Sequence, residues 1–431
     1  MNATLQVLKE RGFFSQCTDV DGLSALMDAG PVTFYEGTDP TGPSLHIGHM
    51  VPYFAFRHML AAGHRGISLL GGGTARIGDP SGKTEMRQML SYETLDANVE
   101  SLKKQLTSFM LSTSSGSDKN SKVMDNVIFE DNKNWLADLN YIDFLREIGS
   151  HFSVNRMLTF ESYKKRLETG LSFLEFNYQL LQSYDFLQLY RRYGCRLQIG
   201  GDDQWGNIVA GADLIRRIEG LEGKKPEECQ VYGLTFPLIT RSDGKKMGKS
   251  EKGAVFVDKT KTSVYDFFQY WRNITDADLK KFFLIFTFLP IDEIEAICAP
   301  GKNPNEGKER LAWEVTSLIH GKDEADKAMA GAKAAFGGGS DGVAADKNAM
   351  PTVPLAKSRF DEGINITDLF YEAKLCATKS DARRLVEQGG ASVNGTALSD
   401  VKALIKKDML DADGELILKA GKKRFSRIVL Q

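Results

Sequence analysis

The chain has 431 residues, of which 42% are hydrophobic and 26% are charged, and its formal net charge is −2 at pH 7. This length predicts two or three domains with a sizeable core, and the composition is ordinary for a globular protein. The near-neutral charge excludes a bulk polycation, so any nucleic-acid surface must be a local patch. There is no apolar stretch of membrane-spanning length and no signal-peptide profile, and the five scattered cysteines indicate free thiols. We expect a cytoplasmic protein with no membrane partner.

The first half of the chain alternates short apolar runs with longer amphipathic ones. This alternation predicts an α/β fold in which helices flank a parallel sheet. Strands are expected at residues 31–36, 66–70, 195–199 and 231–240, and a helix is expected at residues 50–60. Polar, glycine-rich motifs follow these strands, and the carboxyl ends of the strands are where a doubly wound sheet binds its ligands.

The bend between the first strand and the first helix ends in His46-Ile47-Gly48-His49. Backbone N–H groups and the positive end of a helix dipole attract phosphate at such a place, and imidazoles can donate to oxygens that gain charge. A lone His-x-x-His pair is more often structural, and the zinc-protease pattern is missing because no Glu follows His46. A second motif further along the chain strengthens the interpretation of this pair as a phosphate-binding site.

Residues 241–250 read Arg-Ser-Asp-Gly-Lys-Lys-Met-Gly-Lys-Ser and follow an expected strand. Alone, such a run is usually a solvated surface turn. Together with the histidine pair at another strand end, it predicts a mobile cationic loop that closes over a triphosphate, because lysine is a flexible point charge for phosphate.

These two runs resemble the signature motifs of class I aminoacyl-tRNA synthetases. His46–His49 is similar to the first signature, and Lys246-Met247-Gly248-Lys249-Ser250 is similar to Lys-Met-Ser-Lys-Ser, with Gly248 at the third place as is common in bacterial tyrosyl enzymes. Residues 78–83 (Gly-Asp-Pro-Ser-Gly-Lys) and 198–207 (Gln-Ile-Gly-Gly-Asp-Asp-Gln-Trp-Gly-Asn) strengthen the match. The chain therefore resembles the bacterial tyrosyl-tRNA synthetases from near its start to its last residue.

This resemblance implies a tyrosine–tRNA ligase. Such an enzyme activates L-tyrosine with ATP to form tyrosyl-adenylate and pyrophosphate, and then transfers the tyrosyl group to the 3′ end of tRNA(Tyr). ATP is thus expected as a substrate accompanied by Mg²⁺, with no tightly bound cofactor and no metal site built by the protein. A homodimer is also implied, with a helical insertion contributing much of its interface.

Pattern and resemblance together predict four segments. We expect a Rossmann-type catalytic domain, a mobile signature loop followed by a helical domain, a flexible linker, and a small α+β RNA-binding domain similar to a ribosomal protein. Their predicted ranges are 1–240 (with the helical insertion around 123–193), 241–336, 337–355 and 356–431. Within the last segment we expect helices at 366–374 and 380–388 and hairpin-like turns at 394–395 and 413–414. A polar loop is expected at 111–122.

Tyr178, Gln182 and Asp185 are spaced i, i+4, i+7, which places three polar groups on one face of a largely apolar helix. From the residues alone, a buried water network or a helix–helix hydrogen bond explains this equally well. The resemblance implies that Tyr178 and Gln182, with Asp79, hold the ammonium group of tyrosine, and that Asp185 and Tyr35 bond its phenolic hydroxyl. Such a site rejects phenylalanine by about 10⁵-fold, a figure whose standard example is the tyrosyl enzyme itself.

For ATP the resemblance implies a larger set of residues. The catalytic residues would be Thr41, His46, His49, Lys83, Arg87, Lys246 and Lys249. The residues binding ATP and the adenylate would be Gly37, Asp39, His46, His49, Gly201, Asp203, Gln204 and Lys249. No general base is needed, because the carboxylate of tyrosine is already an anion and catalysis comes from alignment and charge stabilisation. Taken without the resemblance, Lys83 and Arg87 read equally well as a solvated basic loop.

The C-terminal segment carries more Lys and Arg than Asp and Glu. Lys374, Lys379, Arg383 and Arg384 are expected to form a stripe that faces the phosphates of tRNA, although each charge alone fits a solvated helix face equally well.

Three other functions remain open. A tryptophanyl enzyme is disfavoured by Tyr35 with Asp185 and by the Asp203-Gln204-Trp205 run. Another nucleotidyl-transferring enzyme with a His-x-Gly-His loop is disfavoured by residues 246–250 and by the C-terminal module. An RNA-binding protein with a decayed catalytic site is disfavoured because every required motif residue is present.

Overall fold

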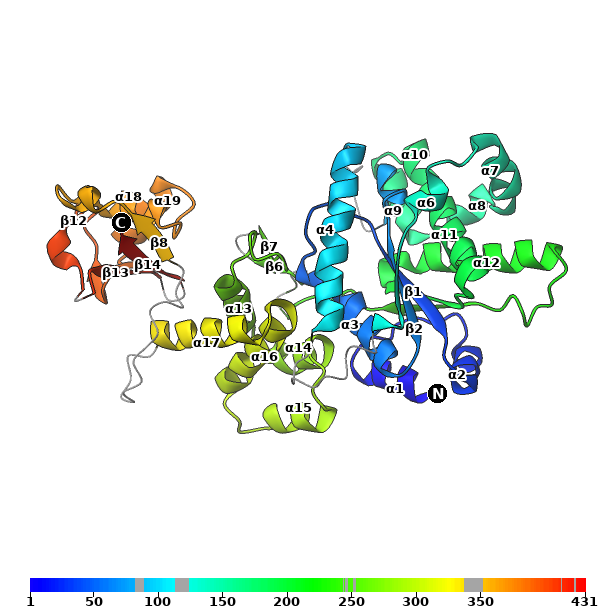
Figure 1. Ribbon diagram of the computed structural model, residues 1–431, viewed down its shortest axis with the longest axis horizontal. Helices are drawn as coiled ribbons and strands as arrows, with labels where there is room; N and C mark the ends of the chain where they lie inside the picture. The colour runs from blue at the N-terminus through cyan, green and yellow to red at the C-terminus, as the bar shows by residue number, and fades with distance from the viewer. Residues whose placement is uncertain are drawn as a thin grey trace. The chain divides into compact units, whose positions relative to one another are not determined.

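The structure is a computed structural model that describes residues 1–81, 89–112, 124–242, 244, 247–250, 253–336, 352–411, 413–421 and 424–431. The chain divides into two compact units (Figure 1). The first unit comprises Met1–Ser263 with Tyr270–Gly321, and the second comprises Val264–Gln269 with Lys322–Gln431. Within the described ranges, no helix is both long and apolar enough to cross a membrane.

The first unit is built on a parallel sheet, whose described strands stand in the order β3-β2-β1-β4-β5. From β1 the chain adds β2 and β3 on one side of the sheet and then adds β4 and β5 on the other side. Doubly wound nucleotide-binding folds change side in the same way, and the strand order confirms the predicted α/β architecture. The strands are β1 (Thr33–Thr38), β2 (Arg65–Leu70), β3 (Val127–Asp131), β4 (Leu197–Gly201) and β5 (Tyr232–Phe236). The sequence analysis does not predict β3, an edge strand whose residues are all only half-buried and therefore give no clear apolar run.

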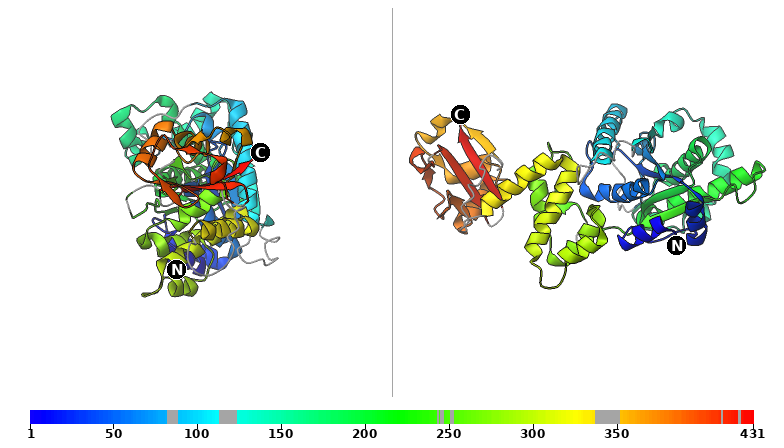
Figure 2. Two further views of the ribbon diagram at one scale, coloured as in Figure 1. Left: turned by 90° about the vertical axis from the view of Figure 1, so that its left-hand side faces the viewer. Right: turned by 60° about the horizontal axis from the view of Figure 1, so that its bottom comes forward.

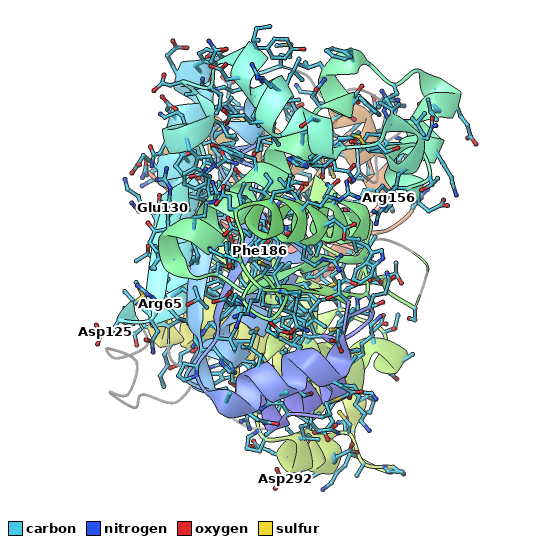
Figure 3. All side chains as sticks on the ribbon, turned by 90° about the vertical axis from the view of Figure 1, so that its right-hand side faces the viewer. Arg65, Asp125, Glu130, Arg156, Phe186 and Asp292 are labelled. Carbon is cyan, nitrogen blue, oxygen red and sulfur yellow. The ribbon has the colours of Figure 1, made fainter. Side chains whose placement is uncertain are left out.

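Neighbouring side chains of β1 point to opposite faces of the sheet, as the two-residue period of a strand requires. On one face the ring of Phe34 packs against Phe56 of α3 with ring centroids 4.7 Å apart. On the other face Tyr35 packs against Phe186 of α11, labelled in Figure 3, with centroids 5.3 Å apart. Helices thus cover both faces, α3 with α1 on one and α11 with α12 on the other (Figure 1 and Figure 2).

The helices that precede the second signature loop have the following bounds: α1 (Ala3–Glu10), α2 (Val20–Ala29), α3 (Ile47–Ala61), α4 (Tyr92–Leu111), α6 (Lys133–Leu136), α7 (Tyr141–Glu147), α8 (Val154–Met157), α9 (Glu161–Thr169), α10 (Phe173–Phe176), α11 (Tyr178–Tyr193) and α12 (Trp205–Leu221). Within the insertion predicted around 123–193, the part from Lys133 to Tyr193 contains helices α6 to α11, whereas Val127–Asp131 form β3. Beyond the sheet lie the short antiparallel pair β6 (Lys249–Ser250) and β7 (Gly253–Ala254), then α13 (Val264–Arg272), α14 (Leu279–Phe286), α15 (Ile291–Ile297), α16 (Pro304–His320) and α17 (Lys322–Phe336).

The second unit contains a mixed sheet in the order β11-β10-β13-β14-β8, in which only the β14–β8 pair is parallel among the described strands. Its elements are β8 (Thr352–Leu355), β9 (Ile364–Asn365), α18 (Ile366–Glu372), α19 (Lys379–Glu387), β10 (Ala391–Val393), β11 (Thr396–Leu398), β12 (Leu404–Ile405), β13 (Glu415–Ala420) and β14 (Arg424–Leu430). The helices α18 and α19 pack on each other and share a buried core with the sheet.

Two expectations for this unit need correction. Thr352–Leu355, assigned above to the linker, form β8 instead, because Val353 and Leu355 pack against the core of the sheet. Asn394-Gly395 makes a true hairpin turn between β10 and β11, with both residues at positive φ. In contrast, the turn at Gly414, which bonds back to Asp411, leads into β13 without joining two paired strands. Most of the predicted loop at 111–122 and linker residues 337–351 lie outside the described residues, and the predicted domain boundaries stay predictions.

Candidate active site at the carboxyl ends of the sheet

His46 caps the amino end of α3 with its side chain. Its Nδ1 accepts hydrogen bonds from the backbone N–H groups of Gly48 (3.1 Å) and His49 (3.3 Å). A nitrogen that accepts cannot carry the proton, so the neutral ring is protonated on Nε2. The rings of His46 and His49 stack with centroids 3.5 Å apart. The N-cap therefore fixes both the orientation of the first histidine and the ring nitrogen from which it donates.

The second signature loop lies directly against this histidine run. The backbone N–H of Ile47 donates to the carbonyl of Val255 (3.0 Å), and the N–H of Val255 donates to the carbonyl of Gly248 (2.7 Å). Gly248 has φ +82°, and a Cβ there would lie 3.0 Å from the backbone nitrogen of Gly48. Glycine at the third place of this loop thus satisfies both the backbone conformation and the close approach. The two motifs, about 200 residues apart in sequence, meet in space.

Tyr35 and Asp185, the residues predicted to form the floor of the site, are both buried. Tyr35 is 1% exposed, and among the described residues its hydroxyl has no hydrogen-bond partner. Asp185 is 2% exposed and accepts from Asn132 Nδ2 (2.8 Å) and from Trp135 Nε1 (2.7 Å). Burial raises the pKa of Asp185 to about 8, helped by the carboxylates of Asp39 and Asp131 and opposed by the two hydrogen bonds. An unsatisfied buried hydroxyl is costly unless a ligand bonds to it.

Asn132 connects this floor to the end of β2. Its Oδ1 accepts from the backbone N–H of Gly73 (2.7 Å), and its Nδ2 also donates to Thr74 Oγ1 (2.9 Å). Thr74 in turn donates to Asp39 Oδ1 (2.7 Å), whose other oxygen accepts from the hydroxyl of Tyr178 (3.0 Å). Asp39 therefore belongs to the same hydrogen-bond network as Tyr178. The sequence analysis missed Asn132, Thr74 and Trp135; the position of Asn132 directly after β3 would have revealed it had that strand been recognised.

A second polar network contains the other predicted ligands of the amino group. Gln204 Nε2 donates to Asp79 Oδ2 (2.8 Å), and Gln182 Nε2 donates to Gln204 Oε1 (3.2 Å). Asn207, also missed by the sequence analysis, donates to Gln182 Oε1 (2.9 Å). The structure thus brings Asp79, Gln182 and Gln204 together, although Asp79 and Gln204 come from loops after β2 and β4. Tyr178, Gln182 and Asp185 lie on one face of α11, as their spacing predicts.

The remaining predicted residues fall into three groups. Gly37 and Thr41 are exposed and Gly201 and Asp203 are half-buried, at the ends of β1 and β4. Lys83, Arg87 and Lys246 and the side chain of Lys249 lie outside the described residues. Lys374, Lys379, Arg383 and Arg384 are all exposed at α18 and α19, and the last three pair with Asp368, Glu387 and Asp381, respectively.

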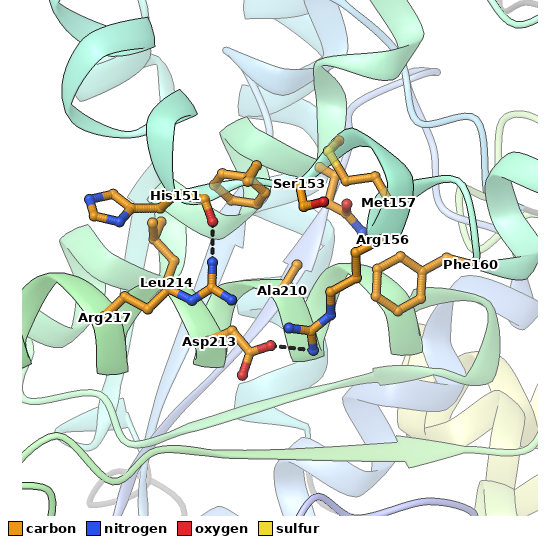
Figure 4. A pocket seen from close by; sticks show the side chains of 11 residues that line it. His151, Ser153, Arg156, Met157, Phe160, Ala210, Asp213, Leu214 and Arg217 are labelled. Carbon is orange, nitrogen blue, oxygen red and sulfur yellow. Dashed lines mark hydrogen bonds and ion pairs between the residues drawn. The ribbon is translucent and has the colours of Figure 1, made fainter.

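A separate small cavity lies between the insertion and α12 (Figure 4). Arg156 pairs with Asp213 at 2.5 Å, and Arg217 donates to the backbone carbonyl of His151. Its volume of about 30 Å³ holds no more than a water or two. Although Gln179 Oε1 on its wall has no partner among the described residues, this volume is too small for an amino acid or a nucleotide, so we do not assign the reaction to this cavity.

The site can perform anion chemistry at the ends of the sheet. Helix α3 presents backbone N–H groups and an oriented imidazole, and the loops and helix beside it carry buried or half-buried hydroxyl, carboxyl and amide groups suited to a small polar molecule. Within the described residues, no group of three or more His, Cys, Asp or Glu side chains could hold a metal ion. Such an arrangement is typical of enzymes that activate a carboxylate with a nucleotide.

Comparison with known proteins defines the family. Residues 27–337 match the family described as "tRNA synthetases class I (W and Y)", and residues 344–428 match the "Tyrosine--tRNA ligase SYY-like C-terminal domain". The chain belongs to the class I tRNA synthetases of this W and Y family. It is 63% identical over 429 residues to the tyrosine–tRNA ligase of Treponema denticola, with 100% of each chain covered. It is 48% identical over 431 residues to that of Clostridium tetani, again with 100% of each covered.

Solved structures agree with the fold. A C-terminally truncated mitochondrial tyrosyl-tRNA synthetase of Aspergillus nidulans is similar with a TM-score of 0.67 and 30% identity, over 76% of this chain and 93% of that chain. A tryptophanyl-tRNA synthetase of Encephalitozoon cuniculi has a TM-score of 0.52 and 14% identity, over 75% of this chain and 87% of that one. At such low identity the second likeness concerns the fold alone.

Proposed function

We propose that this protein is a tyrosine–tRNA ligase that forms tyrosyl-adenylate from L-tyrosine and ATP and then esterifies tRNA(Tyr). The relatives named tyrosine–tRNA ligase, identical at 48–63% of positions over the whole chain, support this function. The observation that carries the choice of amino acid is the buried hydroxyl of Tyr35, which has no partner among the described residues and lies close enough to the buried Asp185 for the two groups to interact electrostatically. A phenol supplies both a donor and an acceptor to such a floor.

Tyrosine would lie with its ring over β1 and its hydroxyl between Tyr35 and Asp185. Its ammonium group would take the place at Asp79, Tyr178 and Gln182, where carboxylate and amide oxygens converge. The raised pKa of Asp185 fits this role, because a protonated or shared carboxyl costs less to bury than an isolated anion. Asn132 and Trp135 hold that carboxyl in a fixed orientation.

ATP would bind where the histidine run meets the second signature loop. The backbone N–H groups at the start of α3 and Nε2 of His46 would face the phosphates, with His49 and Thr41 beside them. Gly37, Asp39, Gly201, Asp203 and Gln204 would line the nucleoside and adenylate. Lys83, Arg87, Lys246 and Lys249 would neutralise the leaving pyrophosphate. The carboxylate of tyrosine attacks the α-phosphorus, the bond to the β-phosphate breaks, and pyrophosphate leaves without a covalent enzyme intermediate.

Partners follow from the same function. Mg²⁺ would arrive with ATP rather than occupy a site of its own, and the basic residues Lys374, Lys379, Arg383 and Arg384 would contact tRNA phosphates. A homodimer would form through the insertion, where large apolar side chains are exposed: Tyr141, Ile142, Val154, Leu167 and Phe173. We place the enzyme in the cytoplasm, where tRNA is charged.

The first test is exchange of labelled pyrophosphate into ATP, measured without tRNA for each of the twenty amino acids. Exchange with tyrosine alone is expected. Exchange with tryptophan instead would overturn the role of Tyr35 and Asp185 while keeping the class. Absence of exchange with every amino acid would contradict the adenylation step itself.

The tRNA contact is tested by charge reversal. Lys374→Glu combined with Arg383→Glu and Arg384→Glu should leave pyrophosphate exchange intact and lower aminoacylation of tRNA(Tyr) by about tenfold or more, since each lost phosphate contact weakens binding. Lys402→Glu combined with Lys406→Glu and Lys407→Glu, which reverses three exposed charges elsewhere in the same unit, is the matched control. Equal loss in both variants would mean that only overall charge matters.

A further inference from the structure

A buried carboxyl on the α3 face of β1 has no role in the site described so far. Glu36 is 5% exposed and lies between Tyr35 and Gly37. Because side chains alternate along a strand, Glu36 points away from the tyrosine floor and toward α3. Its partner in register on β2 is Ser68, which is fully buried. A carboxyl at such a helix–strand contact costs free energy that an apolar side chain would not.

A chain of hydroxyl groups surrounds this carboxyl. Thr38 Oγ1 donates to Oε2 of Glu36 at 3.1 Å and to Oε1 at 3.3 Å. The hydroxyl of Tyr53 is hydrogen-bonded to Thr38 Oγ1 (3.1 Å) and to Ser68 Oγ (3.1 Å), so it reaches Glu36 through Thr38. Burial raises the pKa of Glu36 to about 7, and the hydroxyls of Tyr53 and Thr38 oppose that rise. The four groups form one buried network shared by β1, β2 and α3.

The network joins β1, which leads into Asp39, to α3, which begins at the N-cap His46. Thr38 immediately precedes Asp39, which bonds to Tyr178 on the opposite face of the sheet. Tyr53 follows His49 by four residues and the N-cap His46 by seven, so it lies on the same side of α3 as both histidines. A shift of α3 along β1 would move the histidines relative to Asp39 and would break these hydroxyl bonds. Buried polar networks of this kind fix one packing arrangement.

We propose that Glu36, acting through the hydroxyls of Thr38 and Tyr53, is a positioning residue for adenylate formation that sets the place of α3, and so of His46, relative to the end of β1. This inference rests on the proposed function. It adds a buried residue whose bonds in the structure are to Thr38, and it attributes the free-energy cost of burying this carboxyl to the alignment of the reacting groups. Alignment errors of about an ångström are enough to lower a rate substantially.

Tyr53→Phe is the sharpest test, because it keeps the ring in the core and removes only the hydroxyl that links α3 to Thr38 and, through Thr38, to Glu36. The kcat of tyrosine-dependent pyrophosphate exchange should fall about tenfold, the effect of one lost positioned hydrogen bond, while the KM for tyrosine stays unchanged. Tyr232→Phe, which removes a buried phenol hydroxyl at the amino end of β5, is the matched control and should leave both constants unchanged.

Glu36→Gln keeps the shape and one accepting oxygen, so it should lower kcat less than Glu36→Ala. In the double variant Glu36→Gln with Tyr53→Phe, kcat should fall no further than in Tyr53→Phe alone, because the residues act as one unit. A fall in melting temperature with unchanged kcat would overturn the proposal, as would equal effects on kcat and KM or additive effects in the double variant. Loss of exchange in the unmodified protein would instead refute the proposed function.

Discussion

Two buried carboxyls, those of Asp185 and Glu36, lie on opposite faces of the sheet at β1, and they show that similar burial can serve different functions. Asp185 faces the floor where Tyr35 lies, is oriented by N–H donors from Asn132 and Trp135, and has a pKa of about 8 because neighbouring carboxylates add to the effect of burial. Glu36 faces α3, is surrounded by hydroxyls, and has a pKa of about 7. The first lies beside a hydroxyl without a partner and is suited to a ligand. The second has only protein partners and is suited to hold two elements together.

The largest loss of activity is expected from a substitution at the start of α3, on the same side of the sheet as Glu36. His46→Ala removes the Nε2 donor, so kcat for adenylate formation should fall by about 10²–10³-fold while the dissociation constant for tyrosine hardly changes. Stopped-flow measurement of adenylate formation checks this.

The same substitution also removes the N-cap, which costs about 1 kcal/mol of stability. His46→Asn is the control, since asparagine restores a capping acceptor but not the imidazole donor. Recovery of the full rate in His46→Asn would show that His46 acts only as a cap.

Asp185→Asn tests the role of the buried carboxyl on the opposite face of the sheet, where Tyr35 lies. An amide in place of the carboxyl loses the acceptor for the phenol and conflicts with the donors Asn132 and Trp135, so kcat/KM for tyrosine should fall about 100-fold. The loss should lie mainly in KM. An unchanged KM for tyrosine would place the floor of the pocket elsewhere and would remove the contrast with Glu36.

Tyr35→Phe should have a smaller and more selective effect. Loss of one hydrogen bond to the phenol is expected to lower kcat/KM for tyrosine about tenfold and to leave that for phenylalanine nearly unchanged. Discrimination between the two amino acids, measured by exchange, should therefore fall by about the same factor. Undiminished discrimination would mean that Tyr35 is a core aromatic without a role in specificity.

The smallest expected effect is on stability as a function of pH. The pKa of Asp185 rises from an ordinary value of 3.8 to about 8 on folding, so the folded state binds its proton more tightly. The stabilisation from this proton is complete below pH 4 and is lost as the pH rises toward 8. Without tyrosine, Asp185→Asn should therefore gain melting temperature relative to the wild type between pH 5 and pH 9, by roughly 2–4 °C. A constant difference would contradict the raised pKa.

Much of the fold could be predicted because its signals are local. The apolar runs of β1, β2, β4 and β5 and the spacing of Tyr178, Gln182 and Asp185 each reflect a period that a reader can count. Strand β3 could not be predicted, since a half-buried edge strand shows neither an apolar run nor clear alternation. Residues 352–355 were assigned to the linker because proline and glycine dominate their neighbourhood, whereas their pairing with β14 depends on residues far along the chain.

The residues of the candidate site likewise divide into those that could be predicted from the sequence and those that could not. Motif residues such as His46, Asp79 and Gln204 can be found from sequence because they stand in recognisable runs. Asn132, Thr74 and Glu36 stand in no such run. Asn132 and Thr74 gain their importance from each other, 58 residues apart along the chain, and Glu36 gains its importance through Thr38 from Tyr53 on α3. A buried carboxyl next to a tyrosine in an apolar strand is the one local signal that could have drawn attention to Glu36.

The contact between Gly248 and Gly48 has a consequence for exchanging parts among synthetases. Each glycine leaves room for the backbone of the other loop, and a Cβ on Gly248 would lie 3.0 Å from the nitrogen of Gly48. The two loops are therefore one interlocked unit, although the chain between them is long. A chimera that takes its second signature from an enzyme with serine at the third place would bring a Cβ into this contact at a strained φ, so the first signature would have to shift by a few tenths of an ångström to accommodate it.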